Sequence, residues 1–261
     1  MIRFFDENDK NAVISLWKEA FGDSEEVISV FLNRFGKYML VFEEKNRVIS
    51  MLTVLPVKLN EKKGRYVYAV ATRKEFRGKG YAGRLIEYAK RLIEEKNESF
   101  LVILPQSESL FGFYEKFGFS ELKCATSISE KVPFEIKSNI TADEITAEEY
   151  FECRKRYFKG KNYVEWSIEM LNFFAEIYNG HYFKISENGE EAGCAFCYFY
   201  ENKLVMSELL IGEDKAGIIG EIGRFFGKEE IIGVRERKNG ERFAMIYPKE
   251  PGYCYFGIGM N

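Results

Sequence analysis

The sequence predicts an α/β (α+β) fold in which two related domains follow each other along the chain. Each domain is expected to hold a mixed, mostly antiparallel sheet flanked by helices. Residues 1–130 alternate strand and helix patterns around three consecutive strands, and residues 131–261 repeat the order of two helices, three strands and a helix. With 261 residues, 46% of them hydrophobic, the chain is long enough for two modest cores.

The first domain opens with a predicted strand over residues 2–5 and two amphipathic helices. The helix over residues 9–21 ends at Gly22, and the next is capped by Ser24 and ends at Gly36. Further strands are predicted over residues 38–42, 48–57 and 66–72, followed by a helix over residues 80–96 and a strand over residues 100–104.

The stretch from Arg65 to Gly83, RYVYAVATRKEFRGKGYAG, organises this domain. A buried strand leads through a short charged loop into a glycine-rich turn that opens the helix at Gly80. Small residues there let a ligand approach backbone N–H groups without intrahelical partners, and the helix dipole adds positive potential. This arrangement is typical of a phosphate-binding site.

Two common phosphate loops do not fit the glycine-rich turn. A nucleoside-triphosphate loop needs Lys followed by Ser or Thr after a four-residue spacer, and the segment from Gly78 to Gly80 has neither. The dinucleotide pattern GxGxxG is present from Gly78 to Gly83, but five residues separate it from the strand. The strand ending at Leu104 is also not followed by the carboxylate that binds the ribose.

Two motifs together indicate a family. Read as Arg77-x-x-Gly80-x-Ala82, the turn resembles the acyl-CoA pyrophosphate loop of the GNAT superfamily of N-acetyltransferases. Downstream, PQSESLFGFYEKFGF (residues 105–119) resembles the family's helix-plus-turn signature, with Tyr114 near the helix end. Taken alone, Tyr114 would be read as a half-buried aromatic on a short helix that ends at Gly118. The predicted element order also matches the acetyltransferase fold as far as residue 127.

The resemblance implies transfer of an acetyl group from acetyl-CoA to a primary amine by direct attack in a ternary complex. Backbone N–H groups at residues 70–72 would hold the pantetheine and polarise the carbonyl. Tyr114, with an ordinary pKa near 10, would be the general acid for the departing thiolate. The resemblance assigns acetyl-CoA binding to Val70, Ala71, Thr72, Arg77, Gly78, Lys79, Gly80, Tyr81, Ala82 and Ser107.

Several points stay open at this level. The central strand has no carboxylate, Glu75 lies beyond it, and His181 is read as a surface or packing residue. A water chain or an amine that arrives deprotonated would replace a protein base. The acceptor, a small molecule or a peptide amine, and the oligomeric state are not specified. The alternatives are a module that senses acyl-CoA without turnover, and an aminoacyl or peptidyl transferase of tandem GNAT-like fold.

The second half is predicted to be a degenerate copy without a CoA loop. After a linker over residues 130–141, helices are expected at residues 147–156 and 164–177, strands at 181–186, 192–200 and 203–211, and a helix at 214–226. Where the first half has its phosphate loop, Glu213 and Asp214 would cap the helix and repel a pyrophosphate.

A tandem with one active half resembles the acetyltransferases related to the mycobacterial "enhanced intracellular survival" protein, although their sterol-carrier-like third domain is missing. The uncharged, aromatic stretch from Tyr253 to Asn261 is expected to pack as the final strand of the second half. In those relatives the terminal carboxylate is assigned as a base, so a second hypothesis places the Asn261 carboxylate near Tyr114.

Composition excludes several other classes. A net charge of −3 without a basic block argues against nucleic acid as a partner, and no apolar run is long enough to span a membrane. The five cysteines are expected to be free thiols of a cytoplasmic protein. Cys194 and Cys197 would lie on opposite faces of a strand, so neither a metal site nor any other metal cofactor is predicted.

Overall fold

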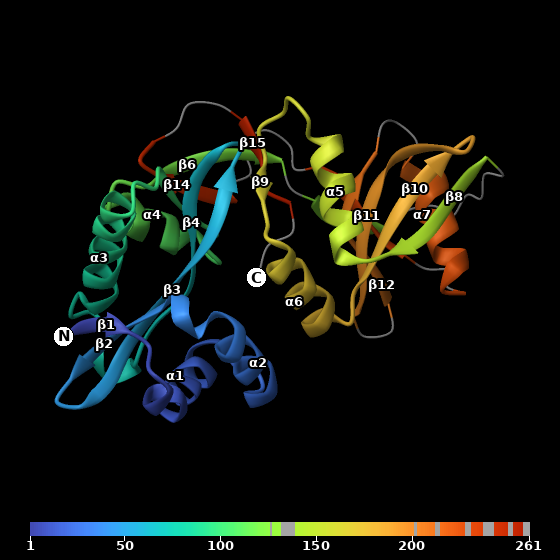
Figure 1. Cartoon of the computed structure of the whole chain (residues 1–261). Helices are drawn as coiled ribbons and strands as arrows, with labels where there is room; N and C mark the ends of the chain where they lie inside the picture. The colour runs from blue at the N-terminus through green and yellow to red at the C-terminus, as the bar shows by residue number, and fades with distance from the viewer. Residues whose placement is uncertain are drawn as a thin grey trace. The chain divides into compact units, whose positions relative to one another are not determined.

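The computed structural model describes residues 1–125, 127–131, 139–200, 203–211, 215–227, 231–236, 243–249 and 253–257. The chain divides into two compact units (Figure 1). Unit 1 comprises Met1–Lys123 and the strand β14 (Ala244–Tyr247). Unit 2 comprises the described parts of Cys124–Glu241 and of Tyr253–Gly259.

Unit 1 is a mixed sheet with helices on both faces, as the sequence predicts. Its strands are β1 (Ile2–Phe4), β2 (Met39–Glu44), β3 (Arg47–Leu59), β4 (Lys62–Thr72), β5 (Phe100–Ile103) and β6 (Ser120–Ala125). Its helices are α1 (Lys10–Phe21), α2 (Glu25–Phe35), α3 (Tyr81–Glu95) and α4 (Glu108–Glu115). Within the unit the strands follow the order β1-β2-β3-β4-β5-β14-β6, and β4 and β5 are the parallel pair among antiparallel neighbours.

The predicted helix ends of unit 1 are confirmed. Gly22 closes α1 with φ +80°, a left-handed conformation that glycine adopts without steric cost. The Ser24 side chain accepts a hydrogen bond from the backbone N–H of Val27 at 3.3 Å and so caps α2. Val13 and Trp17 of α1 are buried, as expected for the apolar side of an amphipathic helix.

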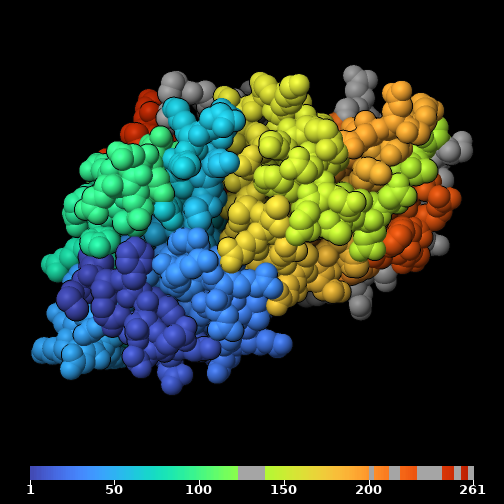
Figure 2. All heavy atoms as spheres, in the orientation of Figure 1, coloured from blue at the N-terminus to red at the C-terminus, as the bar shows by residue number. Residues whose placement is uncertain are grey.

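The two faces of the sheet carry different helices. Helices α3 and α4 pack on one face, where Leu85, Ala89 and Phe111 join one apolar core. Helices α1 and α2 cover the other face, where the Trp17 and Tyr68 rings meet with centroids 5.8 Å apart. Figure 2 shows the β3–β4 hairpin, in cyan, reaching the surface beside α3, in green.

A strand from the far end of the sequence completes the sheet of unit 1. β14 lies between β5 and β6, with Met245 opposite Ile103 on one side and Glu121 on the other. Its residues Ala244, Met245 and Ile246 are fully buried. Because β14 occupies the gap between two strands that follow each other in sequence, residues 1–123 alone do not form a continuous sheet.

Unit 2 repeats the sheet with helices on both faces. Its strands are β7 (Ser127–Lys131), β8 (Ile140–Ile145), β9 (Val164–Glu165), β10 (His181–Glu187), β11 (Glu190–Tyr200), β12 (Lys203–Leu210), β13 (Ile231–Glu236) and β15 (Tyr253–Tyr255). Its helices are α5 (Ala147–Tyr157), α6 (Ile168–Tyr178) and α7 (Lys215–Phe225). Six of these strands form one sheet in the order β7-β13-β12-β11-β10-β8, and β9 and β15 are not part of it. Helix α7 packs on β8, β12 and β13, and α5 packs on β10 and β11.

Two predictions for the second half are wrong in their bounds. The expected linker over residues 130–141 belongs to β7 and β8 at its two ends, and residues 132–138 lie outside the described residues. The helix expected from Val164 starts at Ile168, because the Ser167 side chain accepts from the Met170 N–H and caps it there. A strand is present near the carboxyl end as β15, as expected, but it is not one of the strands of the six-stranded sheet of unit 2, so its predicted place as the final strand of the second half is wrong.

Candidate functional site

An irregularity in β4 marks the centre of unit 1. β4 pairs with β3 through Tyr68↔Thr53 and Ala71↔Met51, and the register shifts between these pairs. Ala69 has φ +52° at this point, in the left-handed region that residues with a Cβ rarely enter. The strand therefore bulges at its centre.

β4 also parts from its parallel neighbour at the same level. Its pairing with β5 ends at Val67↔Ile103. Within the described strands, Ala69 and Val70 thus have no partner on either side. The bulge also shifts the alternation of side chains, so that Val67 and Val70 both face α3 and α4 while Tyr68 faces α1 and α2.

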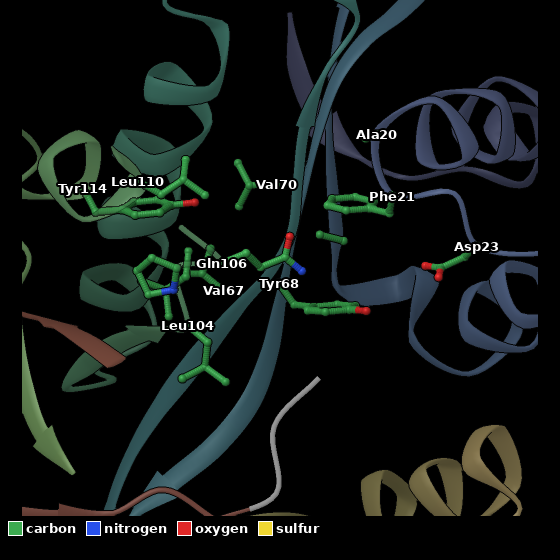
Figure 3. Close-up of a pocket in the computed structure, with 13 residues that line it drawn as sticks. Ala20, Phe21, Asp23, Val67, Tyr68, Val70, Leu104, Gln106, Leu110 and Tyr114 are labelled. Carbon is green, nitrogen blue, oxygen red and sulfur yellow. The ribbon is translucent and has the colours of Figure 1, made fainter. Parts of the chain in front are cut away.

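A cavity of about 220 Å³ opens where β4 and β5 part (Figure 3). Its walls are residues 67–70 of β4, residues 103–106 at the end of β5, Leu110 and Tyr114 of α4, Ala20 and Phe21 of α1, and Asp23. In Figure 3, Tyr114 and Leu110 lie on one side of β4, and Phe21 and Asp23 lie on the other. The cavity therefore borders both helix layers of the unit.

Tyr114 is held on the α4 side of the cavity. Its ring packs against Phe113 and Phe119, with centroids 5.1 and 5.8 Å away, and the residue is 4% exposed. Figure 3 shows its hydroxyl pointing toward Val70. The hydroxyl makes no hydrogen bond with any described residue. Burial raises the pKa of Tyr114 above its ordinary value, because the phenolate would lose its hydration.

The glycine-rich turn before α3 is open to solvent. Gly78 and Gly80 have φ values of +75° and +80°, and a Cβ added to either would meet no atom within 4 Å. The first helical hydrogen bond runs from the Arg84 N–H to the Gly80 carbonyl at 3.0 Å. The N–H groups of residues 81–83 therefore precede the helical ladder and have no intrahelical acceptor. This is the geometry of an anion site at a helix N-terminus.

Exposed cations surround this turn. The Arg77 Nε donates to the Thr72 carbonyl at 3.0 Å, which ties the loop to the end of β4. The Lys79 Nζ donates to the Glu75 carbonyl at 3.2 Å. Arg84 lies over the Tyr81 ring at 5.6 Å. These side chains add positive potential around the open N–H groups, and none of the three is buried.

Arg73 differs from these cations because it is buried. Its guanidinium donates to the Val48 carbonyl and the Ala12 carbonyl, both at 2.9 Å, and so joins α1 to the sheet. It is 7% exposed. The Arg73 guanidinium therefore stabilises the fold and does not belong to the exposed cations around the turn.

Most of the predicted site residues lie along the cavity and the glycine-rich turn. Val70 lines the cavity with Tyr114, and Ala71 and Thr72 continue β4 toward the glycine-rich turn of Arg77 to Ala82. Ser107 stands apart: it is exposed at the start of α4, with its Oγ 3.0 Å from the Ser109 Oγ. The Asn261 carboxylate lies outside the described residues.

Glu75 and His181, which the sequence does not assign as bases, lie away from the cavity. Glu75 is exposed and paired with Arg47 at 2.7 Å. His181 belongs to unit 2, where its Nδ1 lies 2.6 Å from the Glu144 Oε1. Neither lines the cavity.

Asp23 and Tyr68 were missed by sequence reasoning. Asp23 follows the glycine that ends α1 and precedes the cap of α2, so its position suggests no more than a turn residue. Tyr68 sits in a run of β-branched and aromatic residues that reads as buried strand. Asp23 reaches the cavity because the α1–α2 turn lies beside the bulged part of β4, and Tyr68 lines it because it directly precedes the bulge. Local patterns reveal neither arrangement.

The matching place in unit 2 is filled by a buried ion pair. β12 corresponds to β4, because each is central, antiparallel to the preceding strand and parallel to the next, and bulged at Ser207 as β4 is at Ala69. Beside the bulge, Glu208 accepts from the Arg154 Nε at 2.9 Å and from the Tyr150 hydroxyl. The Arg154 and Glu208 side chains are 3% and 0% exposed.

The pair also forms a hydrogen bond with the backbone. The Arg154 Nη1 donates to the Val164 carbonyl at 2.8 Å.

The loop before α7, with Glu213 and Asp214, lies outside the described residues, so the predicted repulsion of a phosphate there stays a prediction.

The cysteines and the remaining acidic groups offer no metal site in the described parts of the chain, where no three His, Cys, Asp or Glu side chains gather as ligands would. Cys153, Cys194, Cys197 and Cys254 are buried free thiols. Cys197 faces the α7 core, and Cys194 lies on the other face of β11, as the strand pattern predicts.

None of the described helices combines the length and apolar character needed to cross a membrane.

Comparison with known proteins agrees with this architecture. Residues 1–122 match the family model described as acetyltransferase (GNAT) domain. No curated protein matches the sequence. A GCN5-related N-acetyltransferase from Anabaena variabilis is similar with a TM-score of 0.73 and 13% identity, over 94% of this chain and 72% of that one.

Two further similar structures bear on the predicted resemblance to tandem GNAT proteins and to the Eis-like acetyltransferases. Eis1 from Mycobacterium abscessus is similar with a TM-score of 0.66 and 10% identity, over 94% of this chain and 73% of that one. A tandem GNAT protein from the clavulanic acid biosynthesis pathway is similar with a TM-score of 0.60 and 10% identity, over 97% of this chain and 100% of that one. At these identities the likeness concerns the fold. Residues 1–122 are thus a GNAT acetyltransferase domain, in a chain with the fold of tandem GNAT proteins.

Proposed function

We propose that unit 1 transfers an acetyl group from acetyl-CoA to a primary amine by direct attack in a ternary complex. The observation that carries this proposal is the bulged centre of β4, which parts from β5 and borders a cavity that also contains the Tyr114 hydroxyl. Unpaired backbone at Ala69 and Val70 offers hydrogen bonds to a thioester and its pantetheine arm.

The turn from Arg77 to Ala82 would hold the pyrophosphate of acetyl-CoA. The absence of a Cβ at Gly78 and Gly80 leaves the approach to the helix N-terminus clear, and the N–H groups of residues 81–83 can donate to phosphate oxygens. The exposed Arg77, Lys79 and Arg84 would balance its charge.

The reaction needs three events at the cavity. The neutral amine nitrogen attacks the thioester carbonyl carbon, and backbone N–H groups of β4 stabilise the charge that develops on the carbonyl oxygen. The C–S bond breaks, and the Tyr114 hydroxyl donates its proton to the departing sulfur. The proton lost by the amine passes to water. Tyr114 suits this role because its raised pKa keeps it protonated at neutral pH.

Unit 2 is proposed to be a structural partner without acyl-CoA chemistry. The Arg154–Glu208 pair occupies the place that corresponds to the cavity of unit 1, and the two side chains already hydrogen-bond each other, with Arg154 also bonded to the Val164 carbonyl.

Product analysis tests the proposal. Incubated with acetyl-CoA and a panel of primary amines, the full chain is expected to release free thiol and N-acetylated amine in equal amounts. Thiol release without acetylated amine would show hydrolysis, and acetyl-CoA binding without either product would show a sensing module. Either result contradicts the proposal.

A further inference from the structure

The turn between α1 and α2 places one carboxylate on the wall of the cavity. Asp23 lines it on the side of β4 opposite Tyr114 (Figure 3). The Trp17 indole N–H donates to Asp23 Oδ2 at 2.7 Å, and Trp17 is itself 2% exposed. A buried indole therefore fixes the orientation of this side chain.

Asp23 keeps one oxygen available. Apart from the bond with Trp17, no hydrogen bond or ion pair joins Asp23 to the described residues. Among the described residues that line the cavity, Asp23 is also the only charged one; the other polar members are Tyr68, Gln106 and Tyr114. The cavity thus carries one negative charge with no positive charge on its wall to balance it.

The neighbours of Asp23 suit an organic cation. The Phe21 and Tyr68 side chains line the same side of the cavity, as Figure 3 shows. Aromatic faces attract cations, and a carboxylate next to them supplies the opposite charge. A second carboxylate brought by a ligand would be repelled by Asp23, because no cation on the described wall would offset it.

The chemistry of the proposed transfer restricts which nitrogen Asp23 holds. An amine must be neutral to attack a thioester, whereas an ion pair with a carboxylate stabilises the ammonium form and raises the pKa of the amine. The nitrogen held by Asp23 is therefore a different nitrogen from the one that reacts. An acceptor that uses both positions carries two amino groups.

We infer that the acceptor of unit 1 is a small diamine or polyamine, whose distal ammonium is bound by Asp23 while its other amine reacts on the Tyr114 side of β4. The inference rests on the proposed transferase function and adds the substrate class. Asp23 acts here as a specificity residue and not as a base.

Three amines with the same four-carbon chain test the assignment: 1,4-diaminobutane, n-butylamine and 4-aminobutanoate. With the parent chain, kcat/KM for the diamine is expected to exceed that for butylamine by roughly tenfold, with 4-aminobutanoate lowest. Asp23→Asn keeps an oxygen for the Trp17 N–H but removes the charge. This substitution is expected to lower kcat/KM for the diamine nearly to the value for butylamine, through a higher KM for the diamine with little change in kcat.

Glu26→Gln is the matched control. It removes one charge from the exposed first turn of α2, three residues away, without touching the cavity wall, and is expected to leave the amine preference unchanged. An unchanged preference in Asp23→Asn would overturn the inference. A kcat that falls about 100-fold in Asp23→Asn, with loss of the acid limb of its pH profile, would also overturn the inference, since that is the behaviour of a general base.

Calorimetry separates this inference from the proposed function. 1,4-Diaminobutane is titrated into the parent chain and into Asp23→Asn without acetyl-CoA, and acetyl-CoA is titrated separately. Weaker diamine binding in Asp23→Asn with unchanged acetyl-CoA affinity supports the inference. Equal diamine affinity in both chains overturns it, even when acetyl-CoA binds and amines are acetylated. Failure of acetyl-CoA to bind the parent overturns the transferase function, whatever the diamine result.

Discussion

At Tyr114, burial and position act together. The ring belongs to the apolar core of unit 1, while the hydroxyl reaches the cavity beside the bulge of β4. Burial raises the pKa of the phenol, so the proton it would donate stays in place through neutral and mildly alkaline pH. If Tyr114 served only to pack the core, phenylalanine would do the same, and a hydroxyl that faces the cavity would not be needed.

Tyr114→Phe is expected to lower kcat by roughly 100-fold with little change in acetyl-CoA affinity, because it removes the general acid and keeps the packing ring. Since the folded pKa is raised, the active protonated form is lost only above about pH 10, the ordinary tyrosine pKa, and the parent should show no alkaline loss from this residue below that pH. Steady-state kinetics between pH 6 and about 10 measure both effects. Equal losses in kcat and in acetyl-CoA affinity would make Tyr114 a binding residue.

At the residue scale, the sequence predicts those positions whose chemistry is written in a local pattern. Arg77, Gly80 and Tyr114 stand in motifs with fixed spacing, so they could be named in advance. Asp23 could not, because its place on the cavity wall depends on how the α1–α2 turn packs on the sheet. The same limit applies to Ala69, whose positive φ is set by the bulge and not by its own preference.

At the scale of elements, β4 and β12 are corresponding strands of the two units whose surroundings differ. Each is bulged beside a parallel neighbour, but the space next to β4 is a cavity, and the space next to β12 holds Arg154 and Glu208. A buried pair of this kind is costly to break, because the partner left behind keeps a charge without water or a counter-charge.

Glu208→Gln is expected to destabilise the chain by about 3–5 kcal/mol, because it leaves the Arg154 guanidinium buried without its counter-charge. Arg156→Gln breaks the Arg156–Glu191 pair, which has a similar 2.8 Å contact but a 57% exposed arginine, and should cost no more than about 1 kcal/mol. Urea unfolding followed by circular dichroism compares the two variants. Similar small losses in both would show that the Arg154–Glu208 pair does not hold unit 2 together.

Element boundaries were predictable where caps are local. Gly22 and Ser24 end and begin helices as their residue types indicate, whereas the predicted linker over residues 130–141 missed two strands whose partners lie far away in sequence. β7 pairs with β13, more than a hundred residues later, and no local pattern specifies such a pairing.

At the scale of the whole molecule, the two units exchange strands. β7 follows β6 in sequence but joins the sheet of unit 2, and β14 follows β13 but joins the sheet of unit 1. The hydrophobic patterns predict the repeated order of elements in the two halves. They do not reveal this exchange, because a buried strand satisfies its pattern equally well in either sheet.

The central claim, that one acetyl-CoA binds per chain at the turn before α3, is tested most directly by calorimetric titration of acetyl-CoA into the parent, Gly80→Asp and Gly80→Asn. Both substitutions place a Cβ at φ +80°, where space is open, so they share the same backbone strain and differ in charge. The parent should bind one equivalent. Gly80→Asn should weaken binding through the side chain it adds, and Gly80→Asp should bind about tenfold or more weakly than Gly80→Asn, since like charges about 4 Å apart repel by ~1–4 kcal/mol. Two equivalents per chain, or equal affinity in Gly80→Asp and Gly80→Asn with unchanged circular dichroism, would contradict the claim.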